Sequence, residues 1–280
     1  MKYQDLHNGD RIPLIGQGTW RLGGGMQPDT SQDEMAVEAI RSAVELGYTH
    51  IDTAEMYGGG HTEELVGQAI RPFKRHDLFI ASKVWKISLD YQDTLQALHG
   101  SLQRLGTDYL DLYMIHRPNQ DLPLEGAFRA LNMAVQQGKV KHLGVSNFDL
   151  AQIERAQAQA ETPLSAVQVP YSLHQRKFQV NGVLKHCQEN HIVVVAYSPL
   201  DRGYLAEDAN VQVMAEKYGA TPAQVALHWL VRQPMVVALP MSTQRAHLVE
   251  NLGALELELT AEDIRALDQI ELSEDKLWPV

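Results

Sequence analysis

The sequence contains one cysteine, Cys187, in 280 residues, so no disulfide can form within the chain. A single free cysteine is typical of a reducing compartment, and we therefore expect a cytoplasmic protein. No uninterrupted apolar run approaches the roughly 18 residues that a membrane span needs. The first residues also lack the apolar segment of a secretory signal peptide.

Positive charge is scarce as well. The 24 Lys and Arg residues are outnumbered by 35 Asp and Glu residues, which leaves a formal net charge of −11. A protein with this charge is a poor partner for nucleic acid or an anionic membrane, although a local basic pocket for a phosphate group stays compatible with it. We therefore expect a small-molecule partner.

No segment rich in Pro, Gly or Ser divides the chain, and no low-complexity stretch interrupts it. Length alone favours about two domains, but α/β barrels of about 250 residues fold as one domain. Near the N-terminus, the segments 3–6 and 11–14 flank Asn8 and Gly9, a dipeptide typical of hairpin turns. We predict a hairpin followed by a barrel, with residues 1–280 forming a single domain.

After the hairpin, short apolar runs alternate with helical patterns. The first helix is expected to start with a capping box formed by Ser31 and Glu34. The predicted strands are 14–19, 49–53, 78–84, 109–115, 142–145, 166–169, 192–196 and 236–239. The predicted helices are 32–46, 62–71, 91–105, 125–137, 150–160, 180–190, 222–233 and 245–254, with further helical segments at 210–218 and 261–270.

Eight strand–helix pairs favour a parallel sheet with right-handed crossovers. The strands are nearly continuous apolar runs, as expected when both faces are buried. Eight such units in about 250 residues fit a (β/α)8 TIM barrel with an N-terminal β-hairpin and an extra C-terminal helix. The alternative, a doubly wound sheet, usually has a glycine-rich phosphate turn after its first strand. Here Arg21 occupies the third glycine position after Gly16 and Gly18, so that fingerprint fails.

Polar residues follow most of the predicted strands, where a barrel forms its active site. Lys83 ends a buried strand, and a buried ammonium group needs an anion, for which Asp52 is the nearest candidate along the fold. An ammonium group also lowers the pKa of a nearby tyrosine hydroxyl, and Tyr57 follows Asp52 by five residues. His116 can orient a substrate oxygen. Together these groups are suited to protonating a carbonyl oxygen while a cofactor supplies hydride.

The motifs around these residues resemble those of the aldo-keto reductases. They are Asp52-Thr53-Ala54 with Tyr57-Gly58, Ser82-Lys83-Val84-Trp85, Ile115-His116-Arg117-Pro118, Gly144-Val145-Ser146-Asn147-Phe148 and Ala196-Tyr197-Ser198-Pro199-Leu200. They occur in the family's order and cover essentially the whole chain. The resemblance implies a catalytic tetrad of Asp52, Tyr57, Lys83 and His116 that reduces aldehydes or ketones to alcohols.

The resemblance also implies a nicotinamide cofactor, NADPH with NADH possible, bound without a Rossmann fold. Ser146, Asn147 and Gln168 would bind the carboxamide, and Tyr197 would stack on the nicotinamide ring. Ser198 and Leu200 would lie along the pyrophosphate. The adenosine end would be surrounded by Ser242, Thr243, His247, Glu250 and Asn251. The family usually has a lysine after the strand-eight proline and an arginine a few residues later, whereas this chain has Met241 and His247.

Aromatic and apolar residues after the early strands indicate a substrate pocket. The candidates are Trp20, Met56 and Trp85, together with Arg117, which could attract an anionic substrate. Core packing remains the alternative for the apolar three, and a solvated loop position is the alternative for Arg117. Trp278 in the C-terminal tail could also reach the pocket.

Two other functional classes compete with a reductase. A metal-dependent barrel hydrolase would need clustered His and carboxylate ligands, often with a His-x-His pair, and no such pair occurs. We therefore expect no metal. A nicotinamide-nucleotide-binding regulatory or redox-sensing subunit with slow turnover is the second alternative. The family resemblance favours a monomer.

Overall fold

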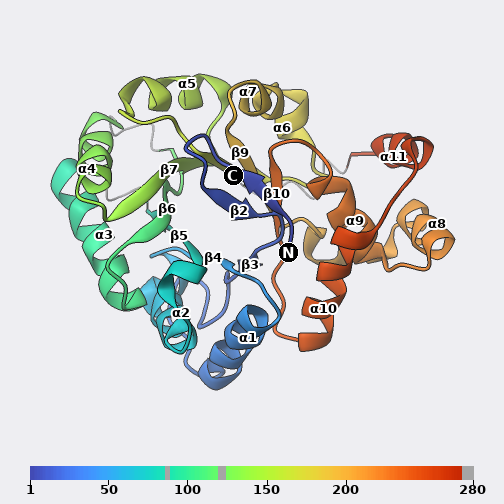
Figure 1. The fold of residues 1–280 in the computed structure, drawn as a ribbon, viewed down its shortest axis with the longest axis horizontal. Coiled ribbons are helices and arrows are strands. Elements are labelled where there is room, and N and C mark those ends of the chain that lie inside the picture. Colours follow the sequence, from blue (N-terminus) through green and yellow to red (C-terminus); the bar gives the residue numbers. More distant parts are fainter. Residues whose placement is uncertain (86–88, 119–123, 273–280) are drawn as a thin grey trace.

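The computed structural model describes residues 1–85, 89–118 and 124–272, so Trp278 lies outside the described residues. Eight parallel strands form one sheet in the order β10-β9-β8-β7-β6-β5-β4-β3. A bridge between Ile15 and Ala238 brings the two ends of this sheet together and closes it into a (β/α)8 barrel. Figure 1 shows the helices around the ring of strands and the N-terminal hairpin lying across one end.

The strands fall close to the predicted segments. They are β1 (Tyr3–Asp5), β2 (Arg11–Pro13), β3 (Gln17–Gly18), β4 (His50–Asp52), β5 (Phe79–Val84), β6 (Leu110–Ile115), β7 (Val140–Ser146), β8 (Ala166–Pro170), β9 (Val193–Tyr197) and β10 (Val236–Leu239). The helices are α1 (Asp33–Glu45), α2 (His61–Ile70), α3 (Tyr91–Leu105), α4 (Leu124–Gln136), α5 (Leu150–Gln159), α6 (Lys177–Val180), α7 (Val183–Glu189), α8 (Ala209–Tyr218), α9 (Pro222–Val231), α10 (Arg245–Gly253) and α11 (Ala261–Asp268). Short 3-10 helices are η1 (Tyr57–Gly60), η2 (Arg75–Asp77), η3 (Asp201–Glu207) and η4 (Ala254–Glu256).

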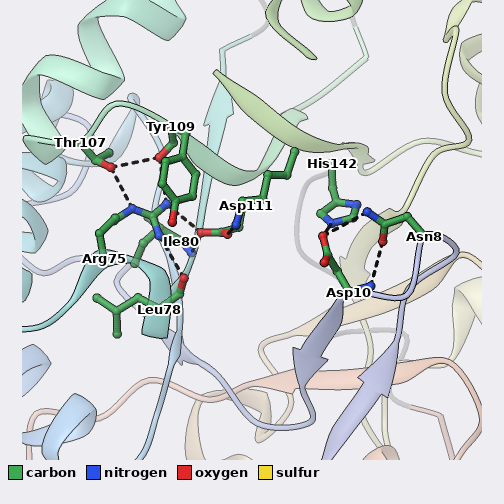
Figure 2. Close-up of polar contacts among 10 residues, drawn as sticks. Asn8, Asp10, Arg75, Leu78, Ile80, Thr107, Tyr109, Asp111 and His142 are labelled. Carbon is green, nitrogen blue, oxygen red and sulfur yellow. Dashed lines mark hydrogen bonds and ion pairs between the residues drawn. The ribbon is translucent and has the colours of Figure 1, made fainter. Parts of the chain in front are cut away.

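The hairpin β1–β2 closes the end of the barrel where the strands begin. Leu6 and Ile12 pack into a buried cluster with inward-facing strand residues such as Phe79 and Leu112. Asp10 receives a 2.8 Å hydrogen bond from His142 Nε2, which ties the hairpin to β7 (Figure 2). This end is therefore filled by side chains, and the opposite end is the one left for a functional site.

A buried carboxylate joins three strands at the same closed end. Asp111 on β6 receives a 2.9 Å hydrogen bond from the backbone N–H of Ile80 and pairs with Arg75 at 2.7 Å and Lys141 at 2.9 Å (Figure 2). These contacts give Asp111 a structural role at the closed end of the barrel. Cys187 is buried in α7, and burial raises the pKa of its thiol to about 12, which fits a packing role.

Two local predictions are wrong. Helix α1 has Gln32 at its N-cap without a side-chain capping bond, so Ser31 and Glu34 do not form a capping box. The backbone N–H of Ser31 instead donates to Asp29 Oδ1, a turn that competes with capping. The predicted helix 180–190 is two helices, α6 and α7, because Gly182 adopts a left-handed φ of 87° between them.

Within the ranges that the structure describes, no helix is long and apolar enough to cross a membrane.

Candidate active site

The ends of β4, β5 and β6 bring the four predicted catalytic residues together. Asp52 is the last residue of β4, Lys83 lies near the end of β5, and His116 directly follows β6. Tyr57 is reached from β4 by a short turn, in which its N–H donates to the carbonyl of Ala54 at 3.0 Å. Parallel pairing of these neighbouring strands explains why residues distant in sequence meet at one end of the barrel.

Gly58, the residue after Tyr57, shapes this turn. Gly58 has a left-handed φ of 56°, and a Cβ there would lie 2.6 Å from the carbonyl oxygen of Gly23. Only glycine satisfies both the conformation and the close approach. The turn therefore fixes the backbone beside Tyr57.

A chain of polar contacts links three residues of the tetrad. Lys83 Nζ donates to Asp52 Oδ1 at 2.6 Å and to the carbonyl of Thr53 at 2.8 Å. It lies 3.4 Å from Tyr57 Oη. The Lys83 side chain is 0% exposed, so its charge is compensated only within the protein. A buried ammonium group held between a carboxylate and a phenol is the arrangement that the sequence predicted.

Burial and charge act on Tyr57 in opposite directions. Burial raises the pKa of Tyr57, and the Lys83 ammonium opposes this rise without reversing it. The Lys83 ammonium group does lower the Tyr57 pKa, as predicted. Burial raises that pKa by more, so the net shift is upward. The pKa of Lys83 itself is raised because Asp52 and Tyr57 together outweigh the effect of burial. These directions favour a protonated Tyr57 and a cationic Lys83.

His116 is neutral beside this chain. Burial, followed by the positive charges of Lys83 and Arg117, holds its pKa well below the usual range. Its ring lies 5.6 Å from the Tyr57 ring and 5.1 Å from the Trp85 ring, both edge-on. Its Nδ1 is buried and has no hydrogen-bond partner among the residues described.

Asn147, which directly follows β7, makes hydrogen bonds to residues at the ends of three strands of the barrel. Asn147 Nδ2 donates 3.0 Å hydrogen bonds to the carbonyl of His116 and to Ser146 Oγ. Its Oδ1 accepts a 2.8 Å hydrogen bond from Tyr197 Oη on β9. This bond anchors the Tyr197 ring, and the residue stays partly exposed. An aromatic ring suits stacking on a flat ligand.

Gln168 on β8 joins this group to the tetrad. Its Nε2 donates a 2.9 Å hydrogen bond to Asp52 Oδ2. Across the described part of the chain, its Oε1 makes no hydrogen bond. An amide oxygen without a protein partner fits an amide N–H₂ group of a ligand, as the nicotinamide carboxamide provides.

The predicted adenosine residues lie after β10 and on α10. Asn251 is buried beside Tyr48, and Ser242 Oγ accepts a 3.1 Å hydrogen bond from the backbone N–H of Gln244. Glu250 accepts a 2.6 Å hydrogen bond from Thr221 at the start of α9. Thr243 is partly exposed and His247 is exposed.

Arg245, a further candidate for the phosphorylated ribose, is directed elsewhere. Its Nη1 donates a 2.7 Å hydrogen bond to Ser42 Oγ and lies 3.7 Å from Glu45 on α1. Among the predicted adenosine residues, His247 is thus left as the one that can carry positive charge.

The predicted substrate residues gather at the open end of the barrel. The Trp20 ring lies 4.8 Å from the Tyr57 ring, and Trp85 lies beside His116. Met56 and Arg117 are each partly exposed. The positive charge of Arg117 acts on Tyr57, His116 and Tyr197, which places its side chain among these groups. Within the described residues no hydrogen bond or ion pair of Arg117 is present.

The sequence did not predict one buried ionic group, which consists of His174, Asp201 and Asp208. His174, in the loop between β8 and α6, lies between the carboxylates of Asp201 and Asp208. These partners follow His174 by 27 and 34 residues, so no local pattern identifies the cluster.

The residues that the structure describes contain no group of three or more His, Cys, Asp and Glu side chains that could hold a metal ion.

A (β/α)8 barrel with a Tyr–Lys–Asp chain beside a partly exposed aromatic ring defines a carbonyl oxidoreductase that uses a nicotinamide nucleotide. The family model described as "Aldo/keto reductase family" matches residues 14–272. The chain belongs to this family and is an oxidoreductase that reduces carbonyl groups.

Relatives of established name agree in sequence and structure. The methylglyoxal reductase YeaE of Escherichia coli is 36% identical over 264 residues, covering 92% of this chain and 90% of that protein. Glyoxal reductase of Bacillus subtilis is 35% identical, with 96% and 92% covered. A thermostable aldo-keto reductase bound to epalrestat has a TM-score of 0.93 and 46% identity, covering 96% of this chain and 99% of that one. An aldo/keto reductase from Klebsiella pneumoniae, solved with NADP and acetate, has a TM-score of 0.88 and 34% identity, with 96% and 95% covered.

Proposed function

We propose that this protein reduces small aldehydes and α-dicarbonyl compounds to alcohols, with Tyr57 as the proton donor. The contact chain from Tyr57 through Lys83 to Asp52 is the observation that carries this proposal. The names of the two bacterial relatives, a methylglyoxal reductase and a glyoxal reductase, support the substrate class. Both substrates are small, with adjacent carbonyl groups that the compact set of polar groups around Tyr57 can bind.

A reduced nicotinamide nucleotide, held by the residues at the ends of β7, β8 and β9, would supply the hydride for the carbonyl carbon. As negative charge grows on the carbonyl oxygen, Tyr57 Oη donates a hydrogen bond and then its proton. The Lys83 ammonium stabilises the phenolate that this leaves, because opposite charges 3.4 Å apart attract strongly in a site shielded from water. Asp52 holds that ammonium group in place.

His116 orients the substrate. A neutral imidazole donates from one nitrogen only. Because Nδ1 is fully shielded, Nε2 is the nitrogen that would direct its N–H at the carbonyl oxygen. Two donors, Tyr57 and His116, then converge on the atom where charge develops.

The cofactor would be held by residues from the opposite side of the barrel. Ser146, Asn147 and Gln168 would bind the carboxamide, and Tyr197 would stack on the nicotinamide ring. Ser198 and Leu200 would lie along the pyrophosphate. The adenosine end would contact Ser242, Thr243, His247, Glu250 and Asn251. Trp20, Met56, Trp85 and Arg117 would line the substrate pocket.

A regulatory or redox-sensing role is not favoured by the relatives, which are named as reductases. We further propose that residues 1–280 form one domain that works as a cytoplasmic monomer without a nucleic-acid partner. The single cysteine and the net charge of −11 support the compartment and the lack of nucleic-acid binding.

Steady-state oxidation of NADPH with methylglyoxal, glyoxal and simple aldehydes tests the proposal. Repeated turnovers with a dicarbonyl are the expected result. Oxidation of a single equivalent of bound NADPH, without further cycles, would reject the reductase and favour a sensor.

A further inference from the structure

The buried histidine outside the tetrad lies between two carboxylates. His174 Nδ1 is 3.0 Å from Asp201 Oδ2, and Nε2 is 2.9 Å from Asp208 Oδ2. The side chains of His174 and Asp201 are 8% and 2% exposed. A neutral imidazole has one N–H and would point a lone pair at one of these carboxylates. Nε2 makes a hydrogen bond with Asp208, whereas Nδ1 lies at ion-pair distance from Asp201 without hydrogen-bond alignment. Two carboxylates within 3.0 Å of the ring nitrogens favour the cationic ring.

Both carboxylates lie on the segment that follows β9. Asp201 begins η3 and also accepts a 2.7 Å hydrogen bond from Ser172 Oγ. Asp208 caps α8 through the backbone N–H groups of Asn210 and Val211. In the part of the chain that the structure covers, the ion pairs of Asp201 are confined to His174. The imidazolium thus ties both ends of residues 201–208 to the loop after β8.

The clamped segment is strained next to the proposed pyrophosphate site. Ser198, Asp201 and Arg202 have left-handed φ values of 51°, 46° and 58° although none is glycine. Such conformations persist only when surrounding contacts hold them. The N–H of Asp201 donates to the carbonyl of Ser198 at 3.1 Å, so the Asp201 side chain and the Ser198 backbone are held as one turn.

We propose that protonated His174 is a positioning residue that holds this turn in the shape that binds the nicotinamide nucleotide, so that nucleotide affinity falls as pH rises. The inference rests on the proposed placement of Ser198 and Leu200 along the pyrophosphate. It goes beyond the proposed reaction, because His174 touches neither substrate nor the reacting atoms.

The charged groups around His174 set the direction of the effect. The carboxylate of Asp201, followed by that of Asp208, raises the His174 pKa above its ordinary value against the opposing effect of burial. The nearest cation along the chain, Arg176, donates to the carbonyls of Asp268 and Ile270 instead. With a raised folded pKa, the clamp is complete below about pH 6.5 and is lost as pH rises through the raised value.

NADH is the probe of choice, because it lacks the 2′-phosphate, whose own titration would affect NADPH. Dissociation constants are measured by fluorescence titration between about pH 6 and pH 9, in unmodified protein and in His174→Gln. Loss of one charge-assisted hydrogen bond corresponds to about tenfold weaker binding. We expect that change across the range in the unmodified protein. His174→Gln should bind weakly at every pH and match the unmodified protein at the alkaline end.

His76→Gln is the matched control, since the His76 side chain is 75% exposed in η2, just before β5 at the closed end of the barrel. It should reproduce the unmodified profile. Asp208→Asn keeps an oxygen for capping α8 but removes one charge, and should move the midpoint of the profile to lower pH. At saturating cofactor, kcat of His174→Gln should be unchanged while KM for the nucleotide rises.

Nucleotide affinity that is independent of pH in an active unmodified enzyme would overturn the inference and leave the proposed function standing. An unmodified profile in His174→Gln would also overturn it. Conversely, pH-dependent binding that His174→Gln abolishes, in a protein without carbonyl turnover, would uphold the clamp and reject the proposed function. If His174→Gln does not fold, the Asp208→Asn profile decides alone, and an unshifted midpoint rejects the proposal.

Discussion

Gln168 and Asp52 are 116 positions apart in sequence, and Gln168 Nε2 donates a 2.9 Å hydrogen bond to Asp52 Oδ2. The other oxygen of the same carboxylate accepts the 2.6 Å bond from Lys83. One carboxylate therefore connects the proposed seat of the carboxamide with the proton donor. Placement of the cofactor and tuning of Tyr57 depend on the same side chain.

Lys83 and Asp52 should act as a unit. Lys83→Met should remove most activity, and the basic limb of the residual pH–rate profile should move to higher pH because the ammonium group no longer opposes the raised Tyr57 pKa. The Lys83→Met, Asp52→Asn double variant should lose less than the sum of the single losses, since residues in one network are non-additive. A double-mutant cycle on kcat/KM measures this coupling, and full additivity would assign Asp52 a separate, structural role.

Tyr57→Phe should lower carbonyl turnover by about 10²–10⁴-fold, the usual contribution of a general acid. The affinity for NADPH should change little, because the proposed cofactor contacts lie on other strands. Single-turnover kinetics and a fluorescence titration separate the two effects, with circular dichroism to check folding. Near-normal turnover in a folded variant would mean that another group donates the proton.

Arg117 should favour carbonyl substrates that carry a carboxylate. It has no ion-pair partner among the described residues, and its charge already acts on Tyr57 and His116. Arg117→Met should raise KM for carboxylate-bearing aldehydes by about tenfold, the value of one hydrogen bond to a charged group. KM for methylglyoxal should change much less.

Arg71→Met, which alters an exposed arginine after α2, is the control for a general change in charge. Equal effects of Arg117→Met on neutral and anionic substrates would show that Arg117 merely supports the loop.

Selectivity for NADPH over NADH should be weak. His247 replaces the arginine expected from the family resemblance, and an imidazole lacks the fixed fork of donors that suits a phosphate. Arg245 is held by Ser42 and Glu45 on α1. His247→Arg should therefore raise the ratio of NADH to NADPH dissociation constants, measured by fluorescence titration.

His99→Arg adds the same group at an exposed position on α3 and should leave that ratio unchanged. Strong NADPH selectivity in the unmodified protein would show that residues other than His247 recognise the 2′-phosphate.

The sequence alone determined the barrel and the chemistry at the strand ends. Apolar runs such as 192–196 and helical patterns such as 91–105 are short-range signals, and β9 and α3 occur close to those segments. In a parallel barrel all strands end on one face. The sequence therefore predicts that the polar residues after these runs lie together, even when the strand register is not known. Two finer predictions were wrong for local reasons. The Ser31 N–H bonds to Asp29 in place of a capping box, and the left-handed backbone of Gly182 divides the predicted helix 180–190.

Only the tertiary structure decided which polar groups pair across distant strands and loops. Three examples join residues far apart in the chain. Gln168 bonds to Asp52, Arg245 bonds to Ser42 on α1, and His174 lies between the carboxylates of Asp201 and Asp208. Each depends on strand register and loop conformation, which no local pattern encodes. Burial also outweighs the charge of Lys83 in raising the pKa of Tyr57, because the cost of removing a group from water depends on everything packed around it.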